Sequence, residues 1–173
     1  MALTTGIAFA EKAPAKVYEL AKTTLQAYGS DPVIIKAVKE ENQKKKTLQQ
    51  IKEMDQKWKN TPGITDYMKA MIESECGRYI MNIQNNNKYY DEIFVMDDQG
   101  ANVAMTDKTS DYWQGDEDKF KKSFKDGAGD IFVDEVEFDD STKSYLVQVS
   151  VPVIEDGKAI GAITFGINID NIE

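Results

Sequence analysis

The chain has 173 residues, of which 41% are hydrophobic, and its formal net charge is −9. A chain of this length can bury one good core, so we expect a single domain, and no stretch is long and apolar enough to cross a membrane. Residues 91–173 carry 20 acidic and 7 basic side chains; such a surface repels phosphate backbones, so we expect no nucleic-acid partner.

The residues that most often carry enzyme chemistry are scarce. The chain has no histidine, the commonest general base and metal ligand, and its one cysteine, Cys76, cannot form an internal disulfide. Cys76 falls within an apolar helical pattern, which favours a buried hydrophobe over a reactive thiol. Acidic clusters such as Asp116-Glu117-Asp118 stand at expected loop tips without the spacing of a calcium loop. We therefore expect no enzyme, no metal and no cofactor.

Residues 1–10 are uncharged and end in Ala8-Phe9-Ala10, directly before Glu11. Small residues at the last and third-last positions are typical of a signal-peptidase site, although the basic start of a signal peptide is missing. We interpret the segment as the remnant of a secretory signal, which predicts a periplasmic or other extracytoplasmic location. A chance apolar tail is the alternative.

Residues 11–90 are expected to form an N-terminal helical region. Apolar residues recur at spacings of three and four over residues 13–28, 33–38, 48–58 and 65–83, as in helices with one buried face. Gly29 is expected to end the first helix, and Ser30 or Asp31 to cap the second, with Pro32 in its first turn. The methionines and aromatic residues of these helices are interpreted as core.

Residues 91–173 are expected to form an antiparallel sheet. Five short strands are predicted, at Asp91–Met96, Ala101–Thr106, Asp130–Phe138, Ser144–Val153 and Ala159–Ile169. In the last strand, Ile163 and Phe165 alternate with Thr164 and Gly166, so one face is apolar and the other is small and partly polar. The apolar face suits the N-terminal helices, and the other face has room for a small molecule. This combination predicts an α+β fold.

The stretch Ser110–Phe120 places two large aromatic residues, Tyr112 and Trp113, between two strand-rich blocks. A loop between rigid strands can hold aromatic and polar side chains over a sheet, which is a common way to build a small-ligand site. The alternative is that both aromatic residues only close the end of the core.

The order of these parts resembles the Cache (PAS-like, PDC) extracytoplasmic sensor domains, over about residues 13–170. The resemblance rests on the helical region, on the hairpin Asp91–Gly100, on the loop Asp111-Tyr112-Trp113-Gln114-Gly115-Asp116-Glu117 and on the closing strands. The helix start Ser30-Asp31-Pro32 and the step from Met54 to Trp58 are also similar to segments of such domains. The single-module form of the family is the most similar.

The resemblance implies a fold with a PAS-like five-stranded antiparallel sheet and long N-terminal helices packed on one face. It also implies a pocket lined by Asp111, Tyr112 and Trp113 from the loop, by Phe132 and Asp134 from the third strand, and by Tyr145, Gln148 and Ser150 from the fourth, with Thr164 as a further candidate. Tyr145 lies on the opposite strand face from Gln148, so it reaches the pocket only through a bulge.

The resemblance further implies a sensor of a small metabolite, most simply a short carboxylate, in chemotaxis or signal transduction. A carboxylate needs a cation, for which Arg78 or Lys108 is available, although Arg78 is also explained as a solvated or helix-capping charge. Tyr112, Trp113 and the acidic residues would instead suit an amine or an amino acid. A membrane receptor or kinase, or the remainder of one, is the expected partner, with a homodimer through the N-terminal helices; a non-enzymatic protein-interaction module is the third alternative.

Overall fold

The computed structural model describes residues 11–139 and 143–172. Its helices are α1 (Ala15–Leu20), a π-helical segment (Ala21–Leu25), α2 (Gln26–Tyr28), α3 (Pro32–Gln43), α4 (Leu48–Lys59), α5 (Asp66–Ile72), α6 (Glu75–Asn85) and α7 (Asp118–Phe124). Its strands are β1 (Tyr90–Met96), β2 (Asn102–Met105), β3 (Phe132–Asp139), β4 (Ser144–Glu155) and β5 (Lys158–Asn168).

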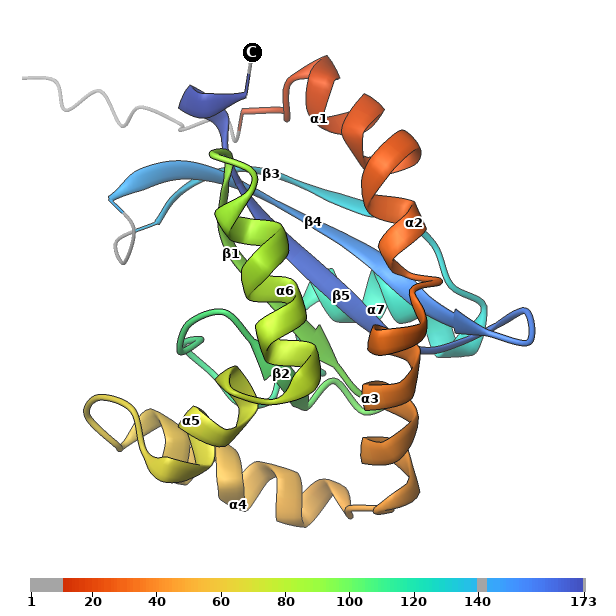
Figure 1. Ribbon diagram of the computed structural model, residues 1–173, viewed down its shortest axis with the longest axis vertical. Helices are drawn as coiled ribbons and strands as arrows, with labels where there is room; N and C mark the ends of the chain where they lie inside the picture. Colours follow the sequence, from red (N-terminus) through yellow and green to blue (C-terminus); the bar gives the residue numbers. More distant parts are fainter. Residues whose placement is uncertain (1–10, 140–142, 173) are drawn as a thin grey trace, which may run out of the picture.

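The strands form one antiparallel sheet with the order β2-β1-β5-β4-β3 (Figure 1). The predicted α+β class and five-stranded antiparallel sheet are therefore confirmed. The expected signal remnant, residues 1–10, and most of the turn between β3 and β4 lie outside the described residues.

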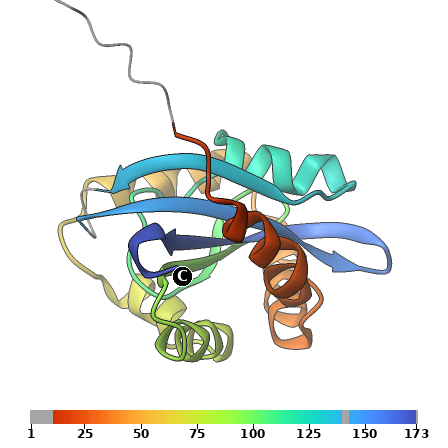
Figure 2. The same cartoon turned by 90° about the horizontal axis from the view of Figure 1, so that it is seen from above.

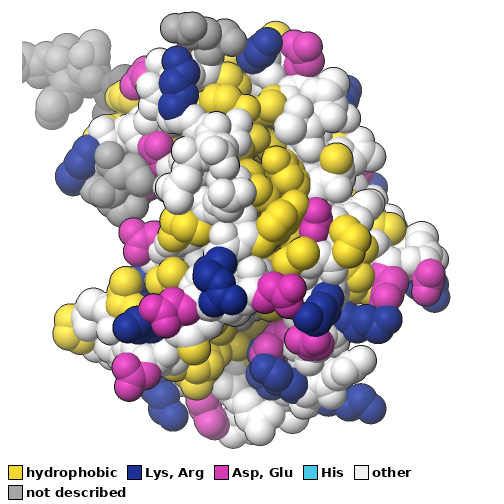
Figure 3. Space-filling view, in the orientation of Figure 1, with side chains coloured by type: hydrophobic (Ala, Val, Ile, Leu, Met, Phe, Trp, Pro, Cys, Tyr) yellow, Lys and Arg dark blue, Asp and Glu magenta, His cyan; other side chains and the backbone are white. Residues whose placement is uncertain are grey.

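The helices α1 to α3 and α6 cover one face of the sheet (Figures 1 and 2). Val17, Leu25 and Ile34 from these helices pack with Ile163 and Phe165 of β5, and all five side chains are fully buried. This is the face that the strand alternation predicted to be apolar. Figure 3 views the molecule from the helix-covered side and shows hydrophobic side chains gathered in the gap between α6 and α2–α3.

A second core lies on the opposite face of the sheet, and it gives the candidate site its surroundings. Ile51 and Trp58 of α4 and Met68 of α5 pack there with Phe94 of β1 and Phe120 of α7. Figure 2 shows helices on both sides of the sheet. The N-terminal helical region therefore divides, because α4 and α5 reach the second core while the other helices cover the first face.

Short polar residues set the helix boundaries. Asp31 caps α3 by accepting a hydrogen bond of 2.8 Å from the Val33 amide, and Pro32 follows it as predicted. The helix predicted over residues 65–83 is two helices, α5 and α6, because Ser74 caps α6 and accepts a hydrogen bond of 2.9 Å from the Gly77 amide. The two helices meet closely at Gly77, where an added Cβ would lie 2.3 Å from the Met71 carbonyl oxygen.

The helix α7 lies where only a loop was expected, after the segment with the aromatic residues. Phe120 and Phe124, one helical turn apart, stack with ring centroids 5.1 Å apart, and Phe120 is buried in the second core. The helix ends where Lys125 and Asp126 take left-handed backbone angles, with φ of 51° for both. The loop between β2 and β3 is therefore shorter than predicted, and its second part is a helix packed across β3, β4 and β5.

Candidate ligand-binding site

The helix α4 holds the loop that was predicted to form the site. The Trp58 indole Nε1 donates a hydrogen bond of 2.7 Å to the Thr109 carbonyl oxygen. Asp55, which is only 3% exposed, accepts hydrogen bonds from the amides of Tyr112 and Trp113 at 3.0 and 3.1 Å. Lys59 Nζ lies 2.7 Å from Asp55 Oδ2 and 2.8 Å from Asp111 Oδ1. The predicted site residue Asp111 is thus part of an ion pair that fixes the loop to α4.

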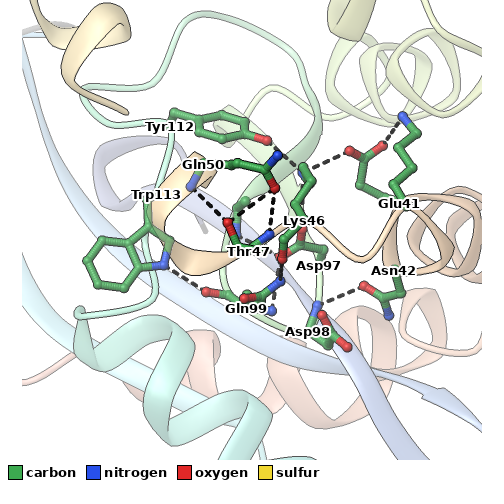
Figure 4. A network of polar contacts seen from close by, with 12 residues as sticks. Glu41, Asn42, Lys46, Thr47, Gln50, Asp97, Asp98, Gln99, Tyr112 and Trp113 are labelled. Atoms are coloured by element: carbon green, nitrogen blue, oxygen red, sulfur yellow. Dashed lines mark hydrogen bonds and ion pairs between the residues drawn. The ribbon is translucent and has the colours of Figure 1, made fainter. Parts of the chain in front are cut away.

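The Tyr112 side chain is part of the second core. It is 1% exposed, and its ring packs at 5.6 Å from Trp58 and 6.1 Å from Tyr67, measured between centroids. Its hydroxyl accepts a hydrogen bond of 2.7 Å from Lys46 Nζ (Figure 4). Burial raises the pKa of Tyr112 to about 12, so the hydroxyl stays neutral. Tyr112 therefore lies where the alternative interpretation of the sequence put it, at the end of the core.

Lys46 joins three separate segments in the same network. Its ammonium nitrogen lies 2.8 Å from Glu41 Oε1 at the end of α3 and 3.3 Å from Asp97 Oδ2 after β1 (Figure 4). Burial alone would lower the pKa of Lys46, but the hydrogen bond to Glu41 and the negative charges of Asp97 and Glu41 raise it overall. Lys46 therefore remains charged and fixes Tyr112 against the corner between α3 and α4.

Trp113 is half-buried beside this network. Its Nε1 donates a hydrogen bond of 2.8 Å to the Gln99 carbonyl oxygen (Figure 4), and Lys52 Nζ stands 4.8 Å from the centroid of its ring. Lys46 Nζ stands 5.4 Å from the centroid of the Tyr112 ring, on the side of its hydroxyl. A lysine of the chain itself thus already contacts the Trp113 ring, which was expected to contact a cationic ligand.

A cavity of about 730 Å³ lies beside the same loop and is lined by loop residues both before and after Tyr112. It is lined by residues of β1, β3 and β4, by residues 108–110 and by α7 with the residues before it. Of the predicted site residues, Lys108, Asp134 and Gln148 line this cavity. A space of this size accommodates a small metabolite.

The remaining predicted site residues lie elsewhere. Ser150 and Thr164 share the face with Gln148, but both are fully buried and their hydroxyls bond to each other at 2.7 Å. Phe132 lies under Lys122 Nζ, 4.7 Å from the ring centroid. Arg78 is exposed on α6 and donates to the Glu73 carbonyl oxygen. Tyr145 is 51% exposed and packs edge-to-face on Phe138, on the strand face away from Gln148.

Glu92 of β1 forms the base of the cavity, and the sequence analysis did not find it. It pairs with Gly166 of β5, where an added Cβ would lie 2.4 Å from Glu92 Cγ, so the missing side chain makes room for the glutamate. Gln148 Nε2 donates a hydrogen bond of 2.8 Å to Glu92 Oε1. Burial raises the pKa of the Glu92 carboxyl group, while the hydrogen bond from Gln148 and the nearby charge of Lys119 oppose this shift.

A signal for Glu92 was present in the sequence. The alternation of β1 places Glu92 on the same face as Phe94 and Met96, where an isolated acid stands out. Its role depends on the pairing with Gly166 and on the neighbouring Gln148, which only the strand register brings together.

The two lysines that line the cavity are both engaged. Lys108 Nζ donates a hydrogen bond of 2.6 Å to the Thr61 carbonyl oxygen after α4. Lys119 Nζ on α7 lies 2.9 Å from Glu117 Oε2 and 5.5 Å from the centroid of the Phe94 ring. The cavity lining contains seven acidic residues, namely Glu92, Glu117, Asp118, Asp134, Glu135, Glu137 and Asp139.

Other chemistry finds little support in the described residues. Within residues 11–139 and 143–172, no group of three or more Cys, Asp or Glu side chains is placed to hold a metal ion. Burial raises the pKa of the Cys76 thiol to about 12, so this buried cysteine has little thiolate character. None of the helices in the described ranges combines the length and the apolar character needed to cross a membrane.

An antiparallel five-stranded sheet with the main helical core on one face, and a second core with a ligand-sized cavity on the other, is typical of a PAS-like sensor domain. The model of the family described as methyl-accepting chemotaxis protein-like, first PDC sensor domain, matches residues 64–173. The match covers more than half of the chain, and the chain therefore belongs to this family. The resemblance to the Cache (PDC) sensor domains is confirmed, whereas the absence of an enzymatic activity stays a prediction.

Solved structures of sensor domains are similar to this chain at low identity. The sensory domain of the Campylobacter jejuni chemoreceptor Tlp3 with isoleucine bound is 19% identical, over 92% of this chain and 65% of that one, with a TM-score of 0.45. The sensor domain of the Vibrio cholerae histidine kinase DctB is 13% identical, over 69% and 48% of the chains, with a TM-score of 0.42.

The ligand-binding domain of the Pseudomonas aeruginosa amino acid chemoreceptor PctC, in complex with GABA, is 12% identical, over 92% of this chain and 64% of that one, with a TM-score of 0.41. The chain thus spans between 48% and 65% of the length of these three structures. No curated protein matches it.

Proposed function

We propose that this sensor domain binds a small molecule in the cavity between Glu92, the loop residues 108–110 and α7. The main support for this proposal is the cavity of about 730 Å³, which lies on the sheet face opposite the main helical core. Glu92 lies on a strand, and the other sides of the cavity come from a loop and a short helix. A bound ligand would therefore contact the rigid sheet and the more mobile loop at the same time.

The proposed site differs from the predicted one in which part of the loop faces the ligand. Lys108, Asp134 and Gln148 line the cavity, and Glu92 and Leu146 join them. Asp111, Tyr112 and Trp113 support the site from behind by fixing the loop to α4. Arg78, Phe132, Tyr145, Ser150 and Thr164 are not among the residues that line the cavity.

The wider setting follows from the family. We propose an extracytoplasmic domain that passes ligand occupancy to the remainder of a chemoreceptor or histidine kinase. A ligand can do this only if it has a different affinity for two conformations of the domain. The homodimer through the N-terminal helices stays a prediction, and a substitution of Tyr18, which is exposed on α1, would test it.

A cavity-blocking substitution tests the site. The side chain of Gln148 lines the cavity, so Gln148→Trp should obstruct the space beside Glu92, whereas Gln49→Trp on the exposed surface of α4 is a matched control. A ligand found by a thermal-shift screen at 100 times its dissociation constant should add about 2.7 kcal/mol to the free energy of unfolding. We expect this gain in the wild type and in Gln49→Trp, but not in Gln148→Trp.

Two controls make the result decisive. The unliganded Gln148→Trp protein must melt cooperatively, as judged by circular dichroism, before its loss of binding is interpreted. A ligand that stabilises Gln148→Trp as much as the wild type would show that the ligand binds outside this cavity.

A further inference from the structure

We propose that the cavity selects its ligand by positive charge, and that Glu92 receives a primary ammonium group of a small organic amine. This inference rests on the proposed function, because it names the ligand class of the same site. It replaces the short carboxylate and the aromatic contacts that the sequence favoured.

The bonding of Glu92 is the first support for an ammonium ligand. Gln148 donates to Oε1, but no donor among the described residues reaches Oε2. No lysine or arginine of the described residues lies within ion-pair distance of this carboxylate either. A carboxylate removed from water costs free energy unless a partner compensates it. An ammonium group has three donors and would supply both the charge and the missing hydrogen bond.

The charge of the lining is the second support. Seven acidic side chains and two lysines line the cavity, so their formal charges leave an excess of negative charge. Lys108 donates to a carbonyl oxygen and Lys119 is paired with Glu117, so part of the hydrogen-bonding capacity of both lysines is already used. A cleft lined by one sign of charge attracts ligands of the opposite sign and repels those of the same sign.

The apolar lining is the third support, because it limits what the rest of the ligand can be. Leu146 of β4 lines the cavity on the same strand face as Gln148. Its side chain offers contacts to a short methylene chain that extends from the ammonium group. A short aliphatic amine therefore matches both the charged base and the apolar side of this cavity.

A matched four-carbon series tests this inference by calorimetry on the whole chain: 1,4-diaminobutane, n-butylamine, 4-aminobutanoate and butanoate. We expect both amines without a carboxylate to bind at least about tenfold more tightly than 4-aminobutanoate, and butanoate not to bind. Glu92→Gln should weaken n-butylamine by at least about tenfold, because it removes the charge and keeps the shape. Glu19→Gln, on the exposed surface of α1 across the sheet, makes the same charge change and should leave affinity within about twofold.

The outcomes are separable. Tighter binding of butanoate than of n-butylamine, unchanged amine affinity in Glu92→Gln, or no binding of any of the four would overturn the amine assignment. Binding of calcium ions that is lost in Glu92→Gln would overturn it in favour of a metal. If an anionic or neutral ligand binds and is lost in Gln148→Trp but not in Glu92→Gln, the proposed function stands and the charge selection falls. Asp134→Asn, at the side of the cavity, should weaken the amines by only about two- to fivefold.

Discussion

Two regions on the same face of the sheet are built differently: a closed end around Tyr112, in the loop between β2 and α7, and an open end around Glu92 of β1, at the cavity. At the Tyr112 end, Asp55 receives two backbone amides and a lysine, and the Tyr112 ring is closed between Trp58 and Tyr67. At the other end, Glu92 receives one amide donor and faces a cavity. The region with many hydrogen bonds and ion pairs holds the fold, and the region whose carboxylate receives one donor can take a ligand.

The largest effect should come from emptying the closed end. Tyr112→Ala removes a fully buried ring that packs on two other aromatic rings, and it also removes the acceptor of Lys46 Nζ. We expect the free energy of unfolding, measured in urea, to fall by about 3–5 kcal/mol.

Tyr112→Phe is the matched control, because it keeps the ring and removes only the hydroxyl that Lys46 contacts. It should cost about 1 kcal/mol and leave ligand affinity in the cavity within about twofold. Loss of ligand binding in a folded Tyr112→Phe protein would place the closed end in the site after all.

A smaller loss should follow from weakening the link between α4 and the loop. Asp55→Asn keeps an oxygen that can accept the amides of Tyr112 and Trp113, but it removes the charge that faces Lys59. Because Asp55 is buried, we expect a loss of about 1–3 kcal/mol in the free energy of unfolding. Lys59→Met removes the other, more exposed partner of the same ion pair. A larger loss of unfolding free energy in Lys59→Met than in Asp55→Asn would contradict the view that the buried Asp55 holds the loop to α4.

The open end should respond with the opposite sign. Glu92→Gln removes a charge whose burial is unfavourable, so at neutral pH the unliganded protein should gain about 0.5–1 kcal/mol in its free energy of unfolding. Residues at functional sites often reduce stability in this way. A clear loss of stability at neutral pH would show that the Glu92 carboxylate has a stabilising partner.

The gain in Glu92→Gln should depend on pH. The pKa of Glu92 is raised in the folded state, so the folded state holds this proton more tightly than the unfolded state. The carboxyl group therefore favours folding most below its unfolded pKa, and this contribution is lost as the pH rises through the raised value. The wild type and Glu92→Gln should be similarly stable in acid and should diverge at higher pH. The groups that act on this carboxyl are Gln148 on β4, Lys119 on α7, Asp139 on β3 and Asp91 on β1.

Local patterns were enough to predict most of the fold. The alternation of Ile163 and Phe165 with Thr164 and Gly166 identified both faces of the sheet, because strand geometry alone determines which side chains share a face. The break at Ser74 and the helix α7 were missed. The break has a local cause, the cap that Ser74 forms on α6, whereas Phe120 of α7 packs against distant segments in the second core.

The candidate site was harder to predict, because its two ends use residues that look alike in the sequence. An aromatic pair such as Tyr112 and Trp113 suits a ligand pocket or a core equally well, and the outcome depends on Asp55, which lies 57 residues before Tyr112. Likewise, Glu92 has no local feature that shows the space above Gly166. Both assignments need the three-dimensional pairing of distant segments.

The smallest effect is expected from Arg78→Ala, because Arg78 lies outside both the closed end and the open end. Arg78, the one arginine of the chain, was one of the two sequence candidates for binding a carboxylate, together with Lys108. The structure places it on the exposed surface of α6, where it donates to the Glu73 carbonyl oxygen, and α6 covers the sheet face opposite the cavity. We expect a change within about 0.5 kcal/mol in the free energy of unfolding and within about twofold in the affinity for any cavity ligand. Calorimetry with the four-carbon series checks both the amines and butanoate in the same variant. A selective loss of carboxylate binding in Arg78→Ala would mean that anions bind on the helix-covered face of the sheet. The contrast between the closed end and the open end would then not explain how this domain recognises its ligand.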